Sequence, residues 1–194
     1  NLFPNAYRQG AKYPAVAASA AAGAYYAGKS YGNIEIEKVA GENGEMPFAV
    51  TGKDENILSV PLEEEVFPDE RVSISVDFSV SLAKINHRLG ITESAVNLGN
   101  FYPVLCGYDG GFYECVYYSS GDPFFSDCAD YEVTFTADEK YTVAASGELK
   151  ESRKEGGGIT NVYALENARD FALCLSENFE TMSASAEGVT VNYY

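Results

Sequence analysis

The stretch Arg71–Leu82, with the sequence RVSISVDFSVSL, alternates polar and apolar side chains without a break. A period of two places alternate side chains on opposite faces of a β-strand. The pattern therefore predicts a strand with one buried face, and with Ser75 and Asp77 on the solvated face. The residues predicted to point into the core are Val72, Ile74, Val76, Phe78 and Val80.

Shorter strand-like segments, separated by turn residues, lie on both sides of this stretch. Those before it are Ile34–Val39, Phe48–Thr51 and Ile57–Pro61. Those after it are Phe101–Cys106, Phe112–Tyr118, Tyr131–Phe135, Tyr141–Ala145, Ile159–Leu165, Phe171–Leu175, Phe179–Ser183 and Val189–Tyr194. Many short strands at this spacing are typical of an antiparallel sandwich or barrel. We expect an all-β, antiparallel β-sandwich in one domain spanning residues 1–194.

Glycine-rich stretches predict two hairpins. Asp109-Gly110-Gly111 predicts a turn between two of these strands, and Gly156–Gly158 predicts the tip of another hairpin, because strand patterns continue on both sides of each. Residues 14–26 depart from the strand pattern. Their alanines favour a short helix, whereas their glycine and tyrosines favour a loop.

Composition bounds the class of protein. The 194 residues carry a formal net charge of −16, and 46% of them are hydrophobic. This balance is typical of a globular domain, and an acidic surface repels phosphates, so we expect no nucleic-acid partner. Acidic runs such as Glu63–Glu65 are interpreted as solvated turns. The longest apolar run, Ala15–Ala27, is too short and too polar for a transmembrane segment. With no sorting motif, both extracytoplasmic and cytoplasmic locations stay open.

Residues that could carry catalysis are few. The single histidine, His87, cannot supply the two histidines of an H-E-x-x-H zinc site. We expect it to be a structural hydrogen-bonding residue at the end of the long strand. No nucleophile elbow and no phosphate-binding glycine loop is present. The sequence therefore predicts a chain with no catalytic residues, no metal site and no cofactor of its own.

The cysteines and aspartates leave alternatives open. The four cysteines, at positions 106, 115, 128 and 174, fit no zinc or redox spacing. Cys106 and Cys115 flank a predicted turn, so they form either a disulfide or two half-buried thiols. Three aspartates within residues 121–130 suit calcium, but Phe124 and Phe125 between them favour a packed structural loop.

Several motifs, in this order along the chain, resemble one protein family. They are Asn1–Arg8 (NLFPNAYR), Ile85–Arg88 (INHR), Asn97–Leu105 (NLGNFYPVL), Gly121–Asp127 (GDPFFSD), Ala129–Thr134 (ADYEVT), Ala144–Leu149 (AASGEL), Asn167–Ala172 (NARDFA) and Gly188–Tyr194 (GVTVNYY). Together they resemble the N-terminal domain of bacterial members of the aminopeptidase N family of zinc metallopeptidases. The resemblance covers nearly the whole chain.

The resemblance implies a saddle-shaped β-sandwich with a β-hairpin preceding Asn1. It also implies a thermolysin-like catalytic domain, with the H-E-x-x-H zinc site, following Tyr194. On this interpretation the chain is an interior piece of a longer protein. Zinc is expected in the catalytic domain and not in this chain. The expected partners are that downstream metallopeptidase domain and a peptide substrate.

The resemblance also indicates candidate substrate-binding residues. Better-known members carry a glutamine and a glutamate that help hold the free amine of the substrate, shortly before a proline that aligns with Pro103. Here Thr92-Glu93-Ser94 occupies the approximate place, and only Glu93 offers a carboxylate. Asn97 and Asn100 are the nearby polar alternatives, so the candidate site is Glu93, Asn97 and Asn100.

The function expected from these observations is that of a non-catalytic N-terminal module. Such a module packs on a metallopeptidase domain and walls one side of its substrate cleft. Two alternatives stay open. The first is a carbohydrate-binding or adhesion module of a bacterial surface protein, for which the 15 tyrosines and 11 phenylalanines would form a platform instead of core. The second is a scaffold domain of a parent protein whose zinc site has decayed.

Overall fold

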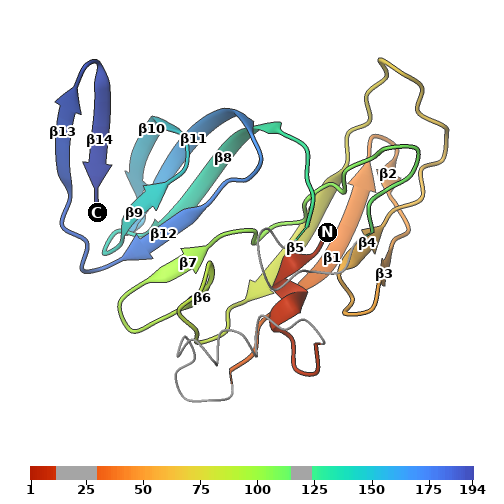
Figure 1. Cartoon of the computed structure of the whole chain (residues 1–194), viewed down its shortest axis with the longest axis horizontal. Helices are drawn as coiled ribbons and strands as arrows, with labels where there is room; N and C mark the ends of the chain where they lie inside the picture. The colour runs from red at the N-terminus through yellow and green to blue at the C-terminus, as the bar shows by residue number, and fades with distance from the viewer. Residues whose placement is uncertain (12–29, 115–123) are drawn as a thin grey trace. The chain divides into compact units, whose positions relative to one another are not determined.

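The structure is a computed structural model that describes residues 1–11, 30–114 and 124–194. Within these ranges the chain is all-β, with one short 3-10 helix and fourteen strands that pair antiparallel in several sheets (Figure 1). The expected all-β, antiparallel, sandwich-like fold is therefore confirmed. The chain divides into two compact units, which are unit 1 (Asn1–Gly90 and Asn100–Asp127) and unit 2 (Ile91–Gly99 and Cys128–Tyr194).

Unit 1 is built around a three-stranded sheet in the order β2-β1-β5. Its strands are β1 (Asn33–Gly41), β2 (Gly44–Glu45) and β5 (Ser75–Ser81). A separate ladder pairs β3 (Ala49–Thr51) with β4 (Ile57–Ser59). The 3-10 helix η1 (Phe3–Tyr7) lies against β1 (Figure 1). A proline in its first turn suits a helix start, because the N–H that proline lacks would have no partner there.

A β-bulge in β1 keeps the apolar residues of that strand on one face. The cross-strand pairs between β1 and β5 are Ile34–Val80, Ile36–Phe78 and Val39–Val76. Ile36 and Val39 are three residues apart, which in a regular strand would place them on opposite faces. The register shifts between Ile36 and Lys38, and this extra residue returns Val39 to the buried face.

The alternation predicted for the long strand is confirmed only within β5. Val76, Phe78 and Val80 are half-buried, and the serines and the aspartate between them are exposed. The prediction is wrong for Val72 and Ile74, which are 53% and 39% exposed and precede the strand. The pairing ends with Ala40 and Ser75. Beyond that point β1 enters its turn into β2 and offers β5 no further partner.

The core of unit 1 gathers around η1, whose five residues are all buried. The ring of Phe3 meets that of Tyr7 edge-on, with 5.6 Å between centroids, and lies 6.1 Å from that of Phe124. The other buried apolar residues of this unit are Leu2, Ala6, Ile34, Val39, Ile57, Ala83, Ile85, Leu89 and Val104. The amino-terminal segment therefore supplies more of the deeply buried surface than the long strand does.

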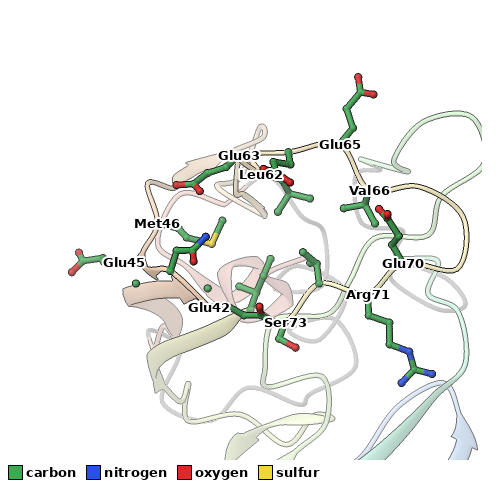
Figure 2. A pocket seen from close by; sticks show the side chains of 16 residues that line it. Glu42, Glu45, Met46, Leu62, Glu63, Glu65, Val66, Glu70, Arg71 and Ser73 are labelled. Carbon is green, nitrogen blue, oxygen red and sulfur yellow. The ribbon is translucent and has the colours of Figure 1, made fainter.

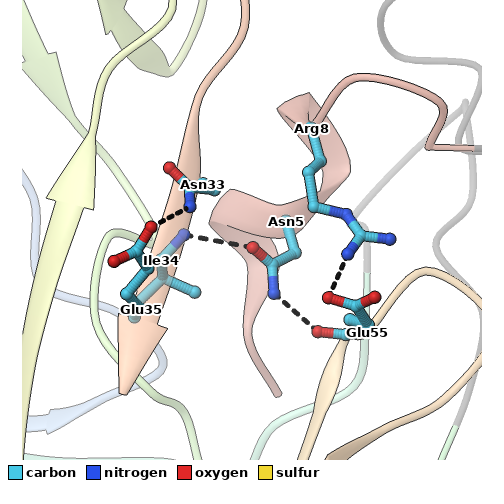
Figure 3. Close-up of polar contacts among 6 residues, drawn as sticks. All are labelled: Asn5, Arg8, Asn33, Ile34, Glu35 and Glu55. Carbon is cyan, nitrogen blue, oxygen red and sulfur yellow. Dashed lines mark hydrogen bonds and ion pairs between the residues drawn. The ribbon is translucent and has the colours of Figure 1, made fainter. Parts of the chain in front are cut away.

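The side chain of Asn5 joins three segments of unit 1 (Figure 3). Its Oδ1 accepts the N–H of Ile34 at 3.1 Å, and its Nδ2 donates to the carbonyl of Glu55 at 2.6 Å. The Glu55 carboxylate also forms an ion pair with Arg8. Because Asn5 is buried, removing its amide would leave backbone groups without partners in the interior, which is costly.

Unit 2 contains two larger sheets and a hairpin. The first sheet has the order β10-β11-β8, with β8 (Ala129–Asp138), β10 (Glu148–Glu155) and β11 (Gly158–Ala168). In the second, the strands of unit 2 have the order β7-β12-β9, with β7 (Val96–Leu98), β9 (Thr142–Ala145) and β12 (Leu173–Ser176). The short strand β6 (Leu89–Ile91) crosses the sequence boundary between the units. The strands β13 (Met182–Ala186) and β14 (Val189–Tyr193) pair only with each other among the described residues.

The core of unit 2 centres on Phe171, which is fully buried just before β12. Its ring lies 6.2 Å from that of Tyr131 on β8 and 6.1 Å from that of Tyr163 on β11. Leu173 and Leu175 of β12 are also buried. Aromatic packing therefore joins the three-stranded sheet to the segment that leads into the second sheet.

The hairpin tip predicted at Gly156–Gly158 is confirmed. Gly156 and Gly157 have φ of 61° and 84° and connect β10 to β11. Two successive residues with positive φ form a type I′ turn, whose twist matches that of the flanking strands. The sequence does not predict β10 itself. All eight of its residues, ELKESRKE, are exposed, so no apolar alternation marks this strand. It is held mainly by backbone pairing to β11, and Lys154 adds an exposed ion pair with Glu139 at 3.7 Å.

Other predictions differ from the structure. Residues 101–106 contain no strand, because Pro103 lacks an N–H and Val104 instead pairs with Asn1 through both backbone groups, at 2.5 and 3.0 Å. Phe112 forms only an isolated bridge with Tyr108. The helix or loop predicted at 14–26 and the strand residues 115–118 lie outside the described ranges. The expectation of a single domain stays a prediction.

Substituting two isoleucines, one buried and one exposed, tests where the hydrophobic core of unit 1 ends. Ile85 is fully buried and Ile74 is 39% exposed, both in unit 1. Ile85→Ala should lower the free energy of unfolding by about 2–5 kcal/mol, because it removes buried contacts and leaves a cavity. Ile74→Ala should cost less than about 1 kcal/mol. Urea titrations followed by far-UV circular dichroism and tyrosine fluorescence measure both, and equal costs would contradict the placement of Ile74.

Candidate functional site

The three predicted substrate-binding residues are divided between the two units of the chain. Glu93 and Asn97 belong to unit 2, and Asn100 belongs to unit 1. Glu93 is exposed in a turn. The Thr92 hydroxyl closes this turn by accepting hydrogen bonds from the N–H groups of Ser94 and Ala95 at 3.3 and 3.0 Å. The Glu93 carboxylate is thus presented to solvent. Its role in substrate binding stays a prediction.

The two asparagines are held by structural contacts. Asn97 lies in β7, and its Oδ1 accepts the Cys174 thiol at 3.0 Å. Burial raises the pKa of the Cys174 thiol, which keeps it protonated as a donor. Asn100 is buried with φ of 55°, a left-handed conformation that asparagine tolerates, and it accepts a hydrogen bond from Arg88 at 3.4 Å. Both amides serve the fold in this structure.

His87 has the structural hydrogen-bonding role that the sequence predicts. Its Nδ1 lies 2.6 Å from the Tyr7 hydroxyl, and the two rings meet edge-on. Burial, and secondarily the Arg88 guanidinium, lower the pKa of His87 below its ordinary value. The imidazole is therefore predominantly neutral at pH 7 and takes part in the packing around η1.

The described residues contain no group of three or more histidine, cysteine, aspartate or glutamate side chains placed to hold a metal ion. Cys106, Cys128 and Cys174 are free thiols, and Cys115 lies outside the described ranges. Asp130 accepts the N–H of Asn167 at 2.8 Å. In the described part of the chain, no helix is long and apolar enough to cross a membrane.

The clearest unpartnered surface in unit 2 is one side of the β13–β14 hairpin, which we call the hairpin face. It consists of the cross-strand pairs Met182–Tyr193, Ala184–Val191 and Ala186–Val189. Met182 and Tyr193 are 65% and 68% exposed. The opposite side is polar, with Ser183 donating to Asn192 at 2.7 Å and Ser185 bonded to Thr190 at 3.0 Å. The hairpin is therefore fully amphipathic, with its apolar side uncovered.

A second exposed surface in unit 1 is aromatic. We call it the aromatic tip, and it consists of Tyr108, Phe112, Tyr113 and Phe125, all exposed. Tyr108 and Phe112 stack edge-on at 5.1 Å, and Tyr113 and Phe125 do so at 5.5 Å. A Cβ at Gly107 would collide with the Phe125 ring, at 2.2 Å. The glycine therefore allows that ring to lie against the backbone.

The third surface is a groove of about 530 Å³ in unit 1, beside the β1–β2 turn (Figure 2). Its acidic lining residues are Glu42, Glu45, Glu63, Glu64, Glu65 and Glu70, and Arg71 is its single basic one. Its apolar lining residues are Met46, Leu62, Val66, Val72 and Ile74. We call this the acidic groove. The sequence predicts only an ordinary solvated turn at Glu63–Glu65. Nothing in the local sequence indicates that the β1–β2 turn lies beside these glutamates.

Comparisons with known proteins give no identification. No protein-family model matches the chain, and no curated protein matches it either.

The burial of His87 leads to a prediction about its titration. The chain has one histidine, so its imidazole proton resonances are unique in the NMR spectrum. We expect a titration midpoint below the ordinary 6.5. Because the folded state binds this proton more weakly than the unfolded state, the contribution of His87 to stability is present above pH 6.5 and is lost as the pH falls through the lowered pKa. A midpoint at or above the ordinary value would contradict the burial of the ring.

Proposed function

We propose that this chain is a non-catalytic module of a zinc-aminopeptidase-like protein, which packs on a metallopeptidase domain and walls one side of its substrate cleft. The observation that carries the proposal is the uncovered hairpin face. The resemblance of the ordered motifs to the aminopeptidase N family also supports it.

The physical case rests on the stability of the hairpin. An isolated two-stranded hairpin is at best marginally stable in water and needs a hydrophobic cover. Here three apolar cross-strand pairs share one side, and the other side is polar. Fully burying one large apolar side chain contributes about 1.5–3 kcal/mol. A cover over Met182, Val191 and Tyr193 would therefore stabilise the hairpin substantially, and an adjoining domain is such a cover.

The non-catalytic part of the proposal is supported by the single histidine. A zinc peptidase site of this class uses two histidines one helical turn apart. The only histidine of this chain is engaged with Tyr7 in the packing of unit 1. The chain would therefore supply a surface, and the metal and its chemistry would reside in the domain that it contacts.

The test is to determine the coding sequence beyond Tyr194 and to express both the extended protein and the 194-residue chain. We expect an H-E-x-x-H motif downstream, and zinc-dependent release of amino acids from aminoacyl p-nitroanilides by the extended protein alone. A downstream sequence without a metallopeptidase domain would overturn the proposal. A metallopeptidase domain that lacks the motif would favour the alternative of a scaffold for a decayed site.

Matched substitutions in the extended protein test the hairpin face itself. Val191→Lys places a charge on the apolar side, whereas Thr190→Lys places the same charge on the polar side of the same strand. We expect Val191→Lys to lower the melting temperature and to expose the junction to protease, because burying an unpaired charge is costly. Thr190→Lys should behave as the unmodified protein. Equal behaviour of the two variants would contradict docking through this face.

A second candidate function, a carbohydrate-binding or adhesion module, is supported by the aromatic tip. Exposed aromatic rings provide flat apolar surfaces with polar edges, and four of them gather there. A glycan array probed with the full chain tests this function. Binding that is lost in Phe112→Ala and kept in Tyr193→Ala would favour it over the packing module.

A further inference from the structure

The segment of residues 71–74, which precedes β5, has the sequence pattern of a strand but no strand partner. Val72 and Ile74 continue the alternation of β5, yet the pairing with β1 stops at Ser75. Among the described residues, no backbone hydrogen bond joins Val72, Ser73 or Ile74 to another segment. The backbone groups and the two exposed apolar side chains are therefore available to a further strand.

These residues form one wall of the acidic groove. Leu62 and Val66 face the same space and are also exposed, so four large apolar side chains meet solvent within one groove. Such a concentration of uncovered apolar surface marks a binding groove more often than scattered exposure does. Figure 2 shows Leu62 and Val66 directed toward the centre of the groove, with Glu45 and Glu65 at its outer ends.

The charge of the groove has one sign. Its lining contains six glutamates and one arginine, and none of the six glutamates forms an ion pair within the described part of the chain. Arg71 extends away from the acidic side chains (Figure 2). Glu70 accepts the N–H of Phe67 at 2.8 Å and so closes a turn. The five remaining glutamates place charges of one sign around an apolar floor, which favours a cationic occupant.

We infer that the acidic groove binds an extended, basic segment of a partner protein. The segment adds a strand beside residues 71–74, with its apolar side chains on the floor and its lysine or arginine side chains on the glutamates. This is strand addition to an exposed edge, in which the backbone provides affinity and alternate side chains provide specificity. It is independent of the hairpin face, which lies in unit 2.

The groove chemistry favours this occupant over simpler ones. A small cation would use the carboxylates but not the four apolar side chains. A nucleic acid would be repelled by the same carboxylates. A peptide with alternating basic and apolar residues satisfies both halves of the groove, because a period of two sends each set to one side.

The full chain is titrated into a fluorescein-labelled peptide of about nine residues that alternates lysine and valine, enough to span the segment at about 3.3 Å per residue. Fluorescence anisotropy at low ionic strength, where screening is weak, measures the affinity. We expect saturable binding that weakens with added salt. Absence of binding, or equal binding of an oligolysine with the same charge, would overturn the proposal.

Two triple variants with the same change of net charge test the location. The groove variant carries Glu63→Gln, Glu64→Gln and Glu65→Gln. The control variant carries Glu132→Gln, Glu151→Gln and Glu166→Gln, all exposed in unit 2. We expect the groove variant to bind the peptide about tenfold more weakly and the control to stay within about twofold. Equal losses in both would show attraction to overall charge alone and would overturn the site.

N-methylated peptides test the strand pairing. In a paired strand, only every second N–H points to the partner, so methylation of one alternate set of amides should abolish binding, whereas methylation of the other set should be tolerated. If both methylated peptides bind as the unmodified peptide does, the pairing with residues 71–74 is wrong.

Discussion

The register between β1 and β5 is the constraint on which unit 1 depends. Three apolar cross-strand pairs, each contributing about 0.2–1 kcal/mol relative to a pair of alanines, stay on one face only because β1 contains a bulge near Glu37. The N–H of Ile34 in the same strand donates to the Asn5 side chain, which holds η1 against β1. At its other end, β1 turns into β2 and leaves the residues before Ser75 without a partner. The register of β1 thus sets the position of the core, and the turn at its end sets the position of the groove.

The fold class follows from the sequence, because alternation and glycine turns are local signals. The buried set in Val76–Val80 and the Gly156-Gly157 turn are examples. Where the outcome depends on partners distant in sequence, local patterns are insufficient. Val72 and Ile74 share the alternation of β5 but lack a neighbouring strand, and β10 has a neighbouring strand but no alternation. Whether a partner strand lies beside the segment decides both cases.

The candidate functional surfaces could be predicted from the sequence only in part. The polarity of β13 and β14 can be read from their alternation, although only the register shows that all apolar residues share one side. The acidic groove combines residues 41–46 with residues 62–66 and 70–74, and no local pattern connects them. Asn97 and Asn100 are three residues apart in the sequence, yet each amide is occupied by a different structural contact.

The charged edge strand β10 has a consequence for how the chain behaves at high concentration. Its three acidic and three basic side chains lie on both faces, in a chain whose net charge is −16. A second sheet that approached this edge would have to dehydrate both faces to reach the backbone, a penalty that short apolar edges do not impose. The β10 edge of the three-stranded sheet is thereby guarded against edge-to-edge growth into fibrils, even though no strand pairs with its outer side among the described residues.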